Sequence, residues 1–207
     1  MATSSPPTSL RSGIAGRLCW SPDVANTVTF RRLLPDDAAL LGQIDRSEIV
    51  SHVYAVHSGE LRTEAAPHEI PGWSTERIDD YPNFNVEFRS ERLRSRLADG
   101  WIAIGAFDQG ALVAYCELRP ALTETTAQVA ELFVSRSHRR TGIGTGLMQR
   151  MGHEARQAGA SHLYVSAIPT DSAVNFYLSQ GFRLNPEPHP ELLALEPKDI
   201  HMIKDLI

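Results

Sequence analysis

A glycine-rich segment between an apolar strand and a helix limits the folds open to this chain more than any other feature. Residues 128–134 have the pattern of a strand, and residues 139–146 then hold three glycines, Gly142, Gly144 and Gly146. From residue 143 to residue 158, apolar side chains recur on one helical face. Glycines at a helix start let a phosphate approach the backbone, where free N–H groups and the positive helix end bind its charge. The segment therefore predicts a cradle for a pyrophosphate.

The spacing of these glycines argues against two common nucleotide sites. A P-loop ends in Gly-Lys-Ser/Thr, whereas Gly144 is followed by Thr145 and Gly146, so an ATP or GTP site is not expected. A dinucleotide-binding fold has Gly-x-Gly-x-x-Gly near its first strand, but here the spacing differs and the glycines come late in the chain. Arg139 or Arg140 would add a cation at the rim of the cradle, and Thr141 or Thr145 a hydroxyl donor.

Strands and helices alternate through the rest of the sequence. Residues 28–33 predict a strand, and Pro35 with two following acids predicts a helix that runs to about residue 45. Residues 101–107 and 111–118 form the clearest hairpin, with a short turn between them. Glycine and proline break any period between residues 45 and 84, so we expect loop and short helix there, facing the substrate. Further elements are expected at 88–97 (helix), 143–158 (helix), 162–168 (strand), 171–180 (helix) and 200–206 (strand), which together indicate an α/β fold with a mixed sheet and helices on its faces.

Length and composition set the broad class. A chain of 207 residues with 42% apolar and 22% charged residues fits one globular domain, here residues 27–207, after a flexible leader at 1–26 rich in Ser, Thr, Pro and Gly. Two cysteines, no metal-ligand spacing, no long apolar run and no secretory signal favour a cytoplasmic protein without metal or membrane partner. A net charge of -5 argues against nucleic acid and is compatible with a cationic small molecule.

Two segments resemble the GNAT superfamily of N-acyltransferases. Residues 131–148 are similar to its acyl-coenzyme A signature, Arg/Gln-x-x-Gly-x-Gly/Ala between a strand and a helix, and residues 173–182 to its second hallmark, Ala-x-x-Phe-Tyr-x-x-x-Gly-Phe. The resemblance implies a GNAT-like, mostly antiparallel sheet flanked by helices, and acetyl-coenzyme A as co-substrate. It departs at Thr170, where family members often have Asn. The residues it implies for the coenzyme are Leu132, Phe133, Val134, Arg139, Arg140, Thr141, Gly142, Ile143, Gly144, Thr145, Thr170, Ala173 and Phe176.

The same resemblance implies direct transfer in a ternary complex, with the backbone N–H groups of residues 133–135 holding the acetyl carbonyl. Tyr177 matches the tyrosine that often protonates the coenzyme thiolate, although it could instead pack on the apolar face of its helix. Glu131 is the leading candidate for a general base and Glu117, on the neighbouring strand, is the second. The alternative for Glu131 is a solvent-facing acid at a sheet edge.

A polar cluster in the front half is placed where family members bind the acceptor. It consists of Asp45, Arg46, Ser47 and Glu48, with His52 and Tyr54. A solvated helix end would give the same pattern. We expect a primary amine of a small molecule as acceptor, such as an aminoglycoside, a polyamine or an amino-acid-like amine. Protein lysine or N-terminal acetylation and a non-catalytic acyl-coenzyme A sensor are the alternatives, and a homodimer is compatible with the sequence.

Overall fold

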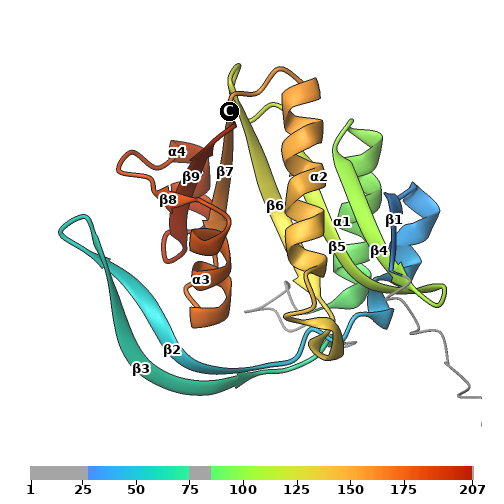
Figure 1. Ribbon diagram of the computed structural model, residues 1–207, viewed down its shortest axis with the longest axis horizontal. Coiled ribbons are helices and arrows are strands. Elements are labelled where there is room, and N and C mark those ends of the chain that lie inside the picture. The colour runs from blue at the N-terminus through green and yellow to red at the C-terminus, as the bar shows by residue number, and fades with distance from the viewer. Residues whose placement is uncertain (1–27, 75–84, 207) are drawn as a thin grey trace, which may run out of the picture.

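The computed structural model describes residues 28–74 and 85–206 (Figure 1). The predicted leader at 1–26 and the end of the predicted loop segment, residues 75–84, lie outside the described residues. Within the described part, no helix is long and apolar enough to cross a membrane.

Seven strands form one mixed sheet. Their order is β1-β4-β5-β6-β7-β9-β8, and every neighbouring pair is antiparallel except β6 and β7. The strands are β1 (Thr29–Arg32), β4 (Ile102–Asp108), β5 (Ala111–Arg119), β6 (Thr126–Val134), β7 (His162–Ala167), β8 (Arg183–Leu184) and β9 (Ile200–Asp205).

Helices cover both faces of this sheet, which confirms the predicted fold class (Figure 1). On one face, α2 (Ile143–Gln157) and α3 (Asp171–Ser179) close the larger apolar core. On the other face, α1 (Val86–Ala98) packs with η1 (Pro35–Gln43), a 3-10 helix where the sequence predicted a helix to about residue 45. A short α4 (Pro190–Leu195), which the sequence did not reveal, closes a small third cluster.

The predicted hairpin between residues 101 and 118 is confirmed as β4 and β5. Gln109 and Gly110 form its two-residue turn, with φ of 49° and 86°. Two successive positive φ values match the right-handed twist of the strands, and glycine adopts them without strain.

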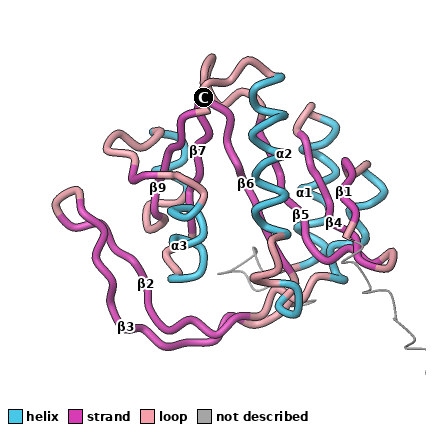
Figure 2. The backbone as a smooth tube through the Cα atoms, in the orientation of Figure 1, coloured by secondary structure: helices cyan, strands magenta, loops and turns pink. Residues whose placement is uncertain are grey.

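The prediction of loop and short helix between residues 45 and 84 is wrong. Glu48–His57 (β2) and Glu60–Ile70 (β3) pair as a long antiparallel ribbon separate from the main sheet (Figure 2). Ser58 and Gly59, with φ of 50° and 80°, make its turn, so the glycine that suggested a break is the hairpin turn itself. Most side chains of the ribbon are exposed, which removes the apolar alternation that would identify a half-buried strand.

The two parallel strands diverge, and this divergence positions the site. β6 and β7 pair only through Thr126–Gln128 and His162–Tyr164, at their first residues. Farther along, β6 remains paired with β5 and β7 with β9 (Figure 1). We call the diverging part, from Val129 to Val134 of β6 and from Val165 to Ala167 of β7, the fork.

Candidate functional site

The edge of β6 that faces the fork carries backbone groups that the sheet does not use. Ser135 N–H donates to Val113 O of β5 at 2.8 Å. Because ladder bonds alternate in an antiparallel pair, the backbone of Phe133 also faces β5, whereas that of Leu132 and Val134 faces the fork. Of the three residues 133–135 whose N–H groups were predicted to hold the acetyl carbonyl, only Val134 directs its N–H towards the fork. The N–H of Leu132, two residues earlier, faces the same way.

The start of α2 supplies three further donors. The first backbone bond of this helix runs from Gly146 N–H to Gly142 O at 2.9 Å, and no backbone acceptor in the described chain receives the N–H groups of Ile143, Gly144 or Thr145. Gly142 has φ 90°, and a Cβ built on it would meet nothing within 4 Å. Three free N–H groups at the positive end of a helix, beside open space, can donate hydrogen bonds to an anion.

The glycine loop, β6 and α3 meet at Gly144. A Cβ added there would lie 3.1 Å from the ring of Phe176 on α3 and 3.8 Å from a methyl group of Val134. Thr145 Oγ1 also accepts a hydrogen bond from Gln180 Nε2 at 3.2 Å. The structure thus brings both sequence hallmarks to the end of the fork, and the absent side chain of Gly144 allows that approach.

Several polar residues predicted for the coenzyme serve the local backbone. Arg139 donates from Nε to Val134 O at 3.0 Å and from Nη2 to Arg46 O at 3.1 Å. Thr141 Oγ1 donates to His138 O, and Thr170 caps α3 by accepting from the backbone N–H of Ala173 at 3.4 Å. Arg140, by contrast, is exposed and has φ 61°, two residues before Gly142. Of the two arginines predicted for the rim, Arg139 is therefore engaged with the backbone and Arg140 is the exposed one.

Tyr177 is buried on the face of the sheet that α2 and α3 cover. Its ring packs edge-on against Phe176 and Phe182, with centroids 5.3 and 5.4 Å away. Burial, and secondly the neighbouring Cys116 of β5, raise the pKa of Tyr177 well above its usual value. The phenol therefore stays protonated at neutral pH and carries a proton that it can donate.

Glu131 lies on the opposite face, beneath α1, and its side chain is 4% exposed. The predicted alternation is confirmed, since Phe133 shares this face and Leu132 packs on the other. The alternative of a solvent-facing acid is wrong. The carboxylate accepts hydrogen bonds from three guanidinium groups and one phenol: Arg89, Arg92, Arg96 at 3.1 Å and Tyr115 at 2.6 Å.

Glu117 sits directly across from Glu131 in the β5–β6 register. Its carboxylate accepts from Arg96 Nη1 at 2.7 Å, and the same nitrogen reaches Glu131. Both candidate bases therefore belong to one buried ionic network. None of the three arginines was recognised as part of it, because only tertiary folding places α1 over these strands.

Strand β2 closes the open end of the fork. At the β6 side, Arg136 N–H donates to Asp45 O and Asp45 N–H to Ser135 Oγ, both at 2.8 Å. At the β7 side, Tyr54 N–H donates to Pro169 O at 2.7 Å. The chain from Asp45 to Tyr54 therefore runs from the end of one parallel strand to the end of the other (Figure 1). We call this segment the crossing.

The predicted acceptor residues are accordingly distributed along this crossing. Tyr54 OH donates to Asn175 Oδ1 of α3 at 2.8 Å, a contact that the sequence did not suggest. At the other end, Ser47 donates hydrogen bonds to Asp45 and lowers the pKa of that carboxyl group. Glu48 lies beside Arg139, with 4.0 Å between Oε2 and Nη1.

An aromatic corner lies next to the crossing, on the α1 face. The guanidinium of Arg46 stacks over Trp73 and Phe133, 5.0 and 5.4 Å from their centroids. Phe133 also stacks on Tyr115, with centroids 5.7 Å apart. Burial, and secondly Arg89, lower the pKa of Arg46 to about 10, which leaves it a cation at neutral pH. The sequence did not indicate that Trp73 belongs to this corner, because Trp73 follows the β2–β3 hairpin, which was predicted as loop and short helix.

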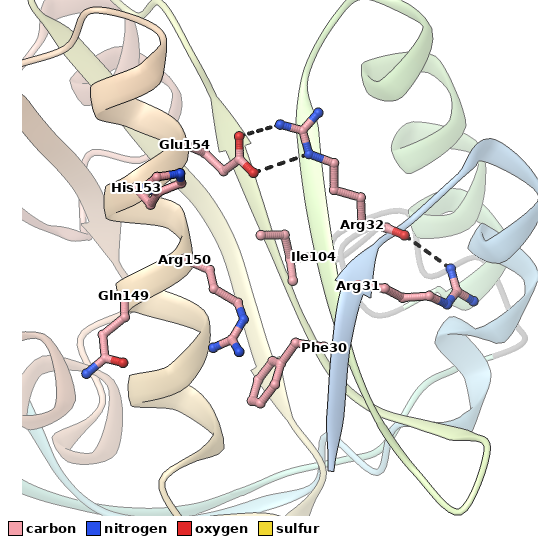
Figure 3. A pocket seen from close by; sticks show the side chains of 8 residues that line it. All are labelled: Phe30, Arg31, Arg32, Ile104, Gln149, Arg150, His153 and Glu154. Atoms are coloured by element: carbon pink, nitrogen blue, oxygen red, sulfur yellow. Dashed lines mark hydrogen bonds and ion pairs between the residues drawn. The ribbon is translucent and has the colours of Figure 1, made fainter.

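A separate hollow of about 430 Å³ lies between α2 and β1 (Figure 3). Its charged groups are engaged, because Arg32 pairs with Glu154 and Arg150 stacks 3.9 Å from the ring centroid of Phe30. This hollow does not adjoin the end of β6, so it is not the site. Among the described residues, no group of His, Cys, Asp and Glu side chains is arranged to hold a metal.

Solved structures share this architecture. Nourseothricin acetyltransferase has a TM-score of 0.64 and 21% identity, over 87% of this chain and 99% of that chain. PaiA N-acetyltransferase from Thermoplasma acidophilum, solved with coenzyme A, has a TM-score of 0.58 and 17% identity over 86% and 99%. An aminoglycoside 6'-N-acetyltransferase complexed with coenzyme A has a TM-score of 0.51 and 20% identity over 63% and 87%. No curated protein sequence matches the chain significantly.

The fold is thus that of acyl-group transferases. The model of the acetyltransferase (GNAT) family matches residues 60–182, and the chain belongs to this family. The match includes β4 to α3, hence the fork, the glycine loop and Tyr177.

Proposed function

We propose that this protein is an N-acetyltransferase that moves the acetyl group of acetyl-coenzyme A to a primary amine of a small molecule, by direct attack in a ternary complex. The observation that carries the proposal is the meeting of three free N–H groups of α2, the fork edge of β6 and α3 around Gly144. Relatives of the same fold have been solved with coenzyme A.

The residues present fit the co-substrate, which supplies the acetyl thioester. The N–H groups of Ile143, Gly144 and Thr145 would hold the pyrophosphate, with Arg140 as a nearby cation. Val134 N–H, which faces the fork, would donate to the acetyl oxygen and stabilise its developing charge. Tyr177 would donate its proton to the departing thiolate.

A small acceptor is favoured by the course of β2. Because the segment from Asp45 to Tyr54 is fastened at both sides of the fork, it limits the room for a polypeptide laid across the strand ends. The names of two relatives point the same way, since nourseothricin and aminoglycosides are small amine-bearing molecules.

The test is a thiol-release assay with acetyl-coenzyme A and a panel of aminoglycosides, polyamines, amino acids and lysine-containing peptides. We expect turnover with at least one small amine. Tyr177→Phe should lower kcat by about 100- to 10,000-fold, the range of general acid catalysis, and leave the Kd for acetyl-coenzyme A unchanged. Turnover confined to peptides would support a protein acetyltransferase. Tight acetyl-coenzyme A binding without thiol release for any amine would support a sensor.

A further inference from the structure

We infer that Glu48 is the general base that removes the proton from the acceptor ammonium, an assignment that rests on the proposed function. The resemblance pointed first to Glu131 on β6, and placed Glu48 only within a polar acceptor cluster. In the structure, Glu48 and Glu131 differ in the hydrogen bonds that their carboxylates accept and in their positions relative to the fork.

Arg139 fixes the position of Glu48. Its guanidinium donates to Val134 O and to Arg46 O, which ties the beginning of the β2 crossing to the last residue of β6. Oε2 of Glu48 lies 4.0 Å from Nη1 of the same guanidinium. The Arg139 side chain therefore lies between the carboxylate of Glu48 and Val134, the residue whose N–H faces the fork.

The carboxylate of Glu48 is also available. No hydrogen bond to it is present in the described part of the chain; its 4.0 Å separation from Arg139 is longer than a hydrogen bond, and Arg46 is a second cation that interacts with it. Its side chain is 15% exposed, so it is shielded from bulk water but remains accessible. Glu131 has four donors and is 4% exposed, which leaves it little capacity to take a proton.

The chemistry balances with the groups in hand. A primary ammonium, the main form of an amine at neutral pH, gives one proton to Glu48 and becomes the nucleophile. Its nitrogen then forms the C–N bond to the acetyl carbon as the C–S bond breaks. The thiolate takes the Tyr177 proton, and the second nitrogen proton restores Tyr177 through solvent. The products are the amide and free thiol, and Glu48 releases its proton to water.

The decisive variant is Glu48→Gln, assayed with whichever amine the wild type accepts. We expect kcat to fall by about 100- to 10,000-fold with the Kd for acetyl-coenzyme A unchanged. The decline of wild-type kcat at acidic pH, where a carboxylate base becomes protonated, should be absent from the variant. Glu69→Gln is the matched control, because Glu69 is an exposed glutamate on the partner strand of the same ribbon.

Several results would overturn the assignment. Wild-type kcat and pH profile in Glu48→Gln, with only a lower melting temperature, would make the Glu48–Arg139 contact a structural ion pair. A raised acceptor KM with unchanged kcat would make Glu48 a binding residue. If the wild type fails to release thiol with every amine in the panel, the proposed function and this assignment are refuted together. If the wild type is active and the variant is equally active, the assignment alone is refuted.

Discussion

Gly144 lacks a side chain at the point where α2, α3 and β6 meet, and this gives the residue a second role beside phosphate approach. Gly144→Ala would place a methyl group 3.1 Å from the Phe176 ring. Overpacking usually costs about 1–3 kcal/mol in the free energy of unfolding, and the preference of a helix for alanine over glycine offsets about 0.5–1 kcal/mol of it, so we expect a net loss at the low end of that range. Urea titration of the single variants and of the double variant with Phe176→Leu measures the coupling. Because the smaller side chain relieves the contact, the double variant should be more stable than additivity predicts, and strict additivity would contradict this contact.

Individual residues also show where sequence reasoning succeeds. Gly142 and Gly144 were identified from the local glycine pattern and Phe176 from the family resemblance, and the structure places Gly144 against the Phe176 ring. Glu131 was placed on the correct face of β6, yet its partners could not be seen, because α1 and β6 are distant in sequence and meet only in the folded chain. A residue type and its strand face are local properties, whereas the hydrogen bonds that occupy a carboxylate are not.

At the scale of elements, the start of η1 depends on one carboxylate. Asp37 accepts hydrogen bonds from Arg31 and from the backbone N–H of Leu34, both at 2.8 Å or less. The hydrogen bond from Arg31 is the main reason that the pKa of Asp37 falls from 3.8 to about 2. Because the pKa of Asp37 is lower in the folded state, this carboxylate stabilises the protein at any pH above its pKa in the unfolded state. The contribution is lost as the pH falls towards 2.

Asp37→Asn tests this dependence. Since Arg31 is about half exposed, solvent screening reduces the effect to about 1 kcal/mol at neutral pH. The difference in unfolding free energy between wild type and variant should be constant above pH 5 and shrink between pH 4 and pH 2. Urea titrations across that range measure it. A difference that is independent of pH would show that Asp37 acts through the geometry of the η1 start and not through its charge.

The ribbon of β2 and β3 is the element that the sequence concealed. Its strands bury few side chains, and Ile49 is 65% exposed, so no alternation of burial marks them. Its position is set by backbone bonds at Asp45 and Tyr54 to the ends of β6 and β7. Hydrogen bonds between distant backbone groups leave no trace in composition or period. The β4–β5 hairpin, in contrast, is apolar on both faces and was predicted correctly.

At the scale of the molecule, the two faces of the sheet divide the proposed work. The α2 and α3 face carries the phosphate cradle and the proton donor Tyr177, while the α1 face carries the ionic network. That network spans α1, β5 and β6 with Glu131 at its centre. Removing one partner of a buried ionic group leaves the others desolvated and unpaired, which costs about 3–5 kcal/mol.

Glu131→Gln should therefore be a stability variant. A loss of about 3–5 kcal/mol corresponds to roughly 10 °C in melting temperature for a chain of this size. Glu154→Gln is the control, because its partner Arg32 is largely exposed and such pairs contribute at most about 1 kcal/mol. Below its melting temperature, Glu131→Gln should keep the acid limb of the wild-type pH profile. An unchanged melting temperature together with a 100-fold loss of kcat and of that limb would instead return the role of base to Glu131 and remove it from Glu48.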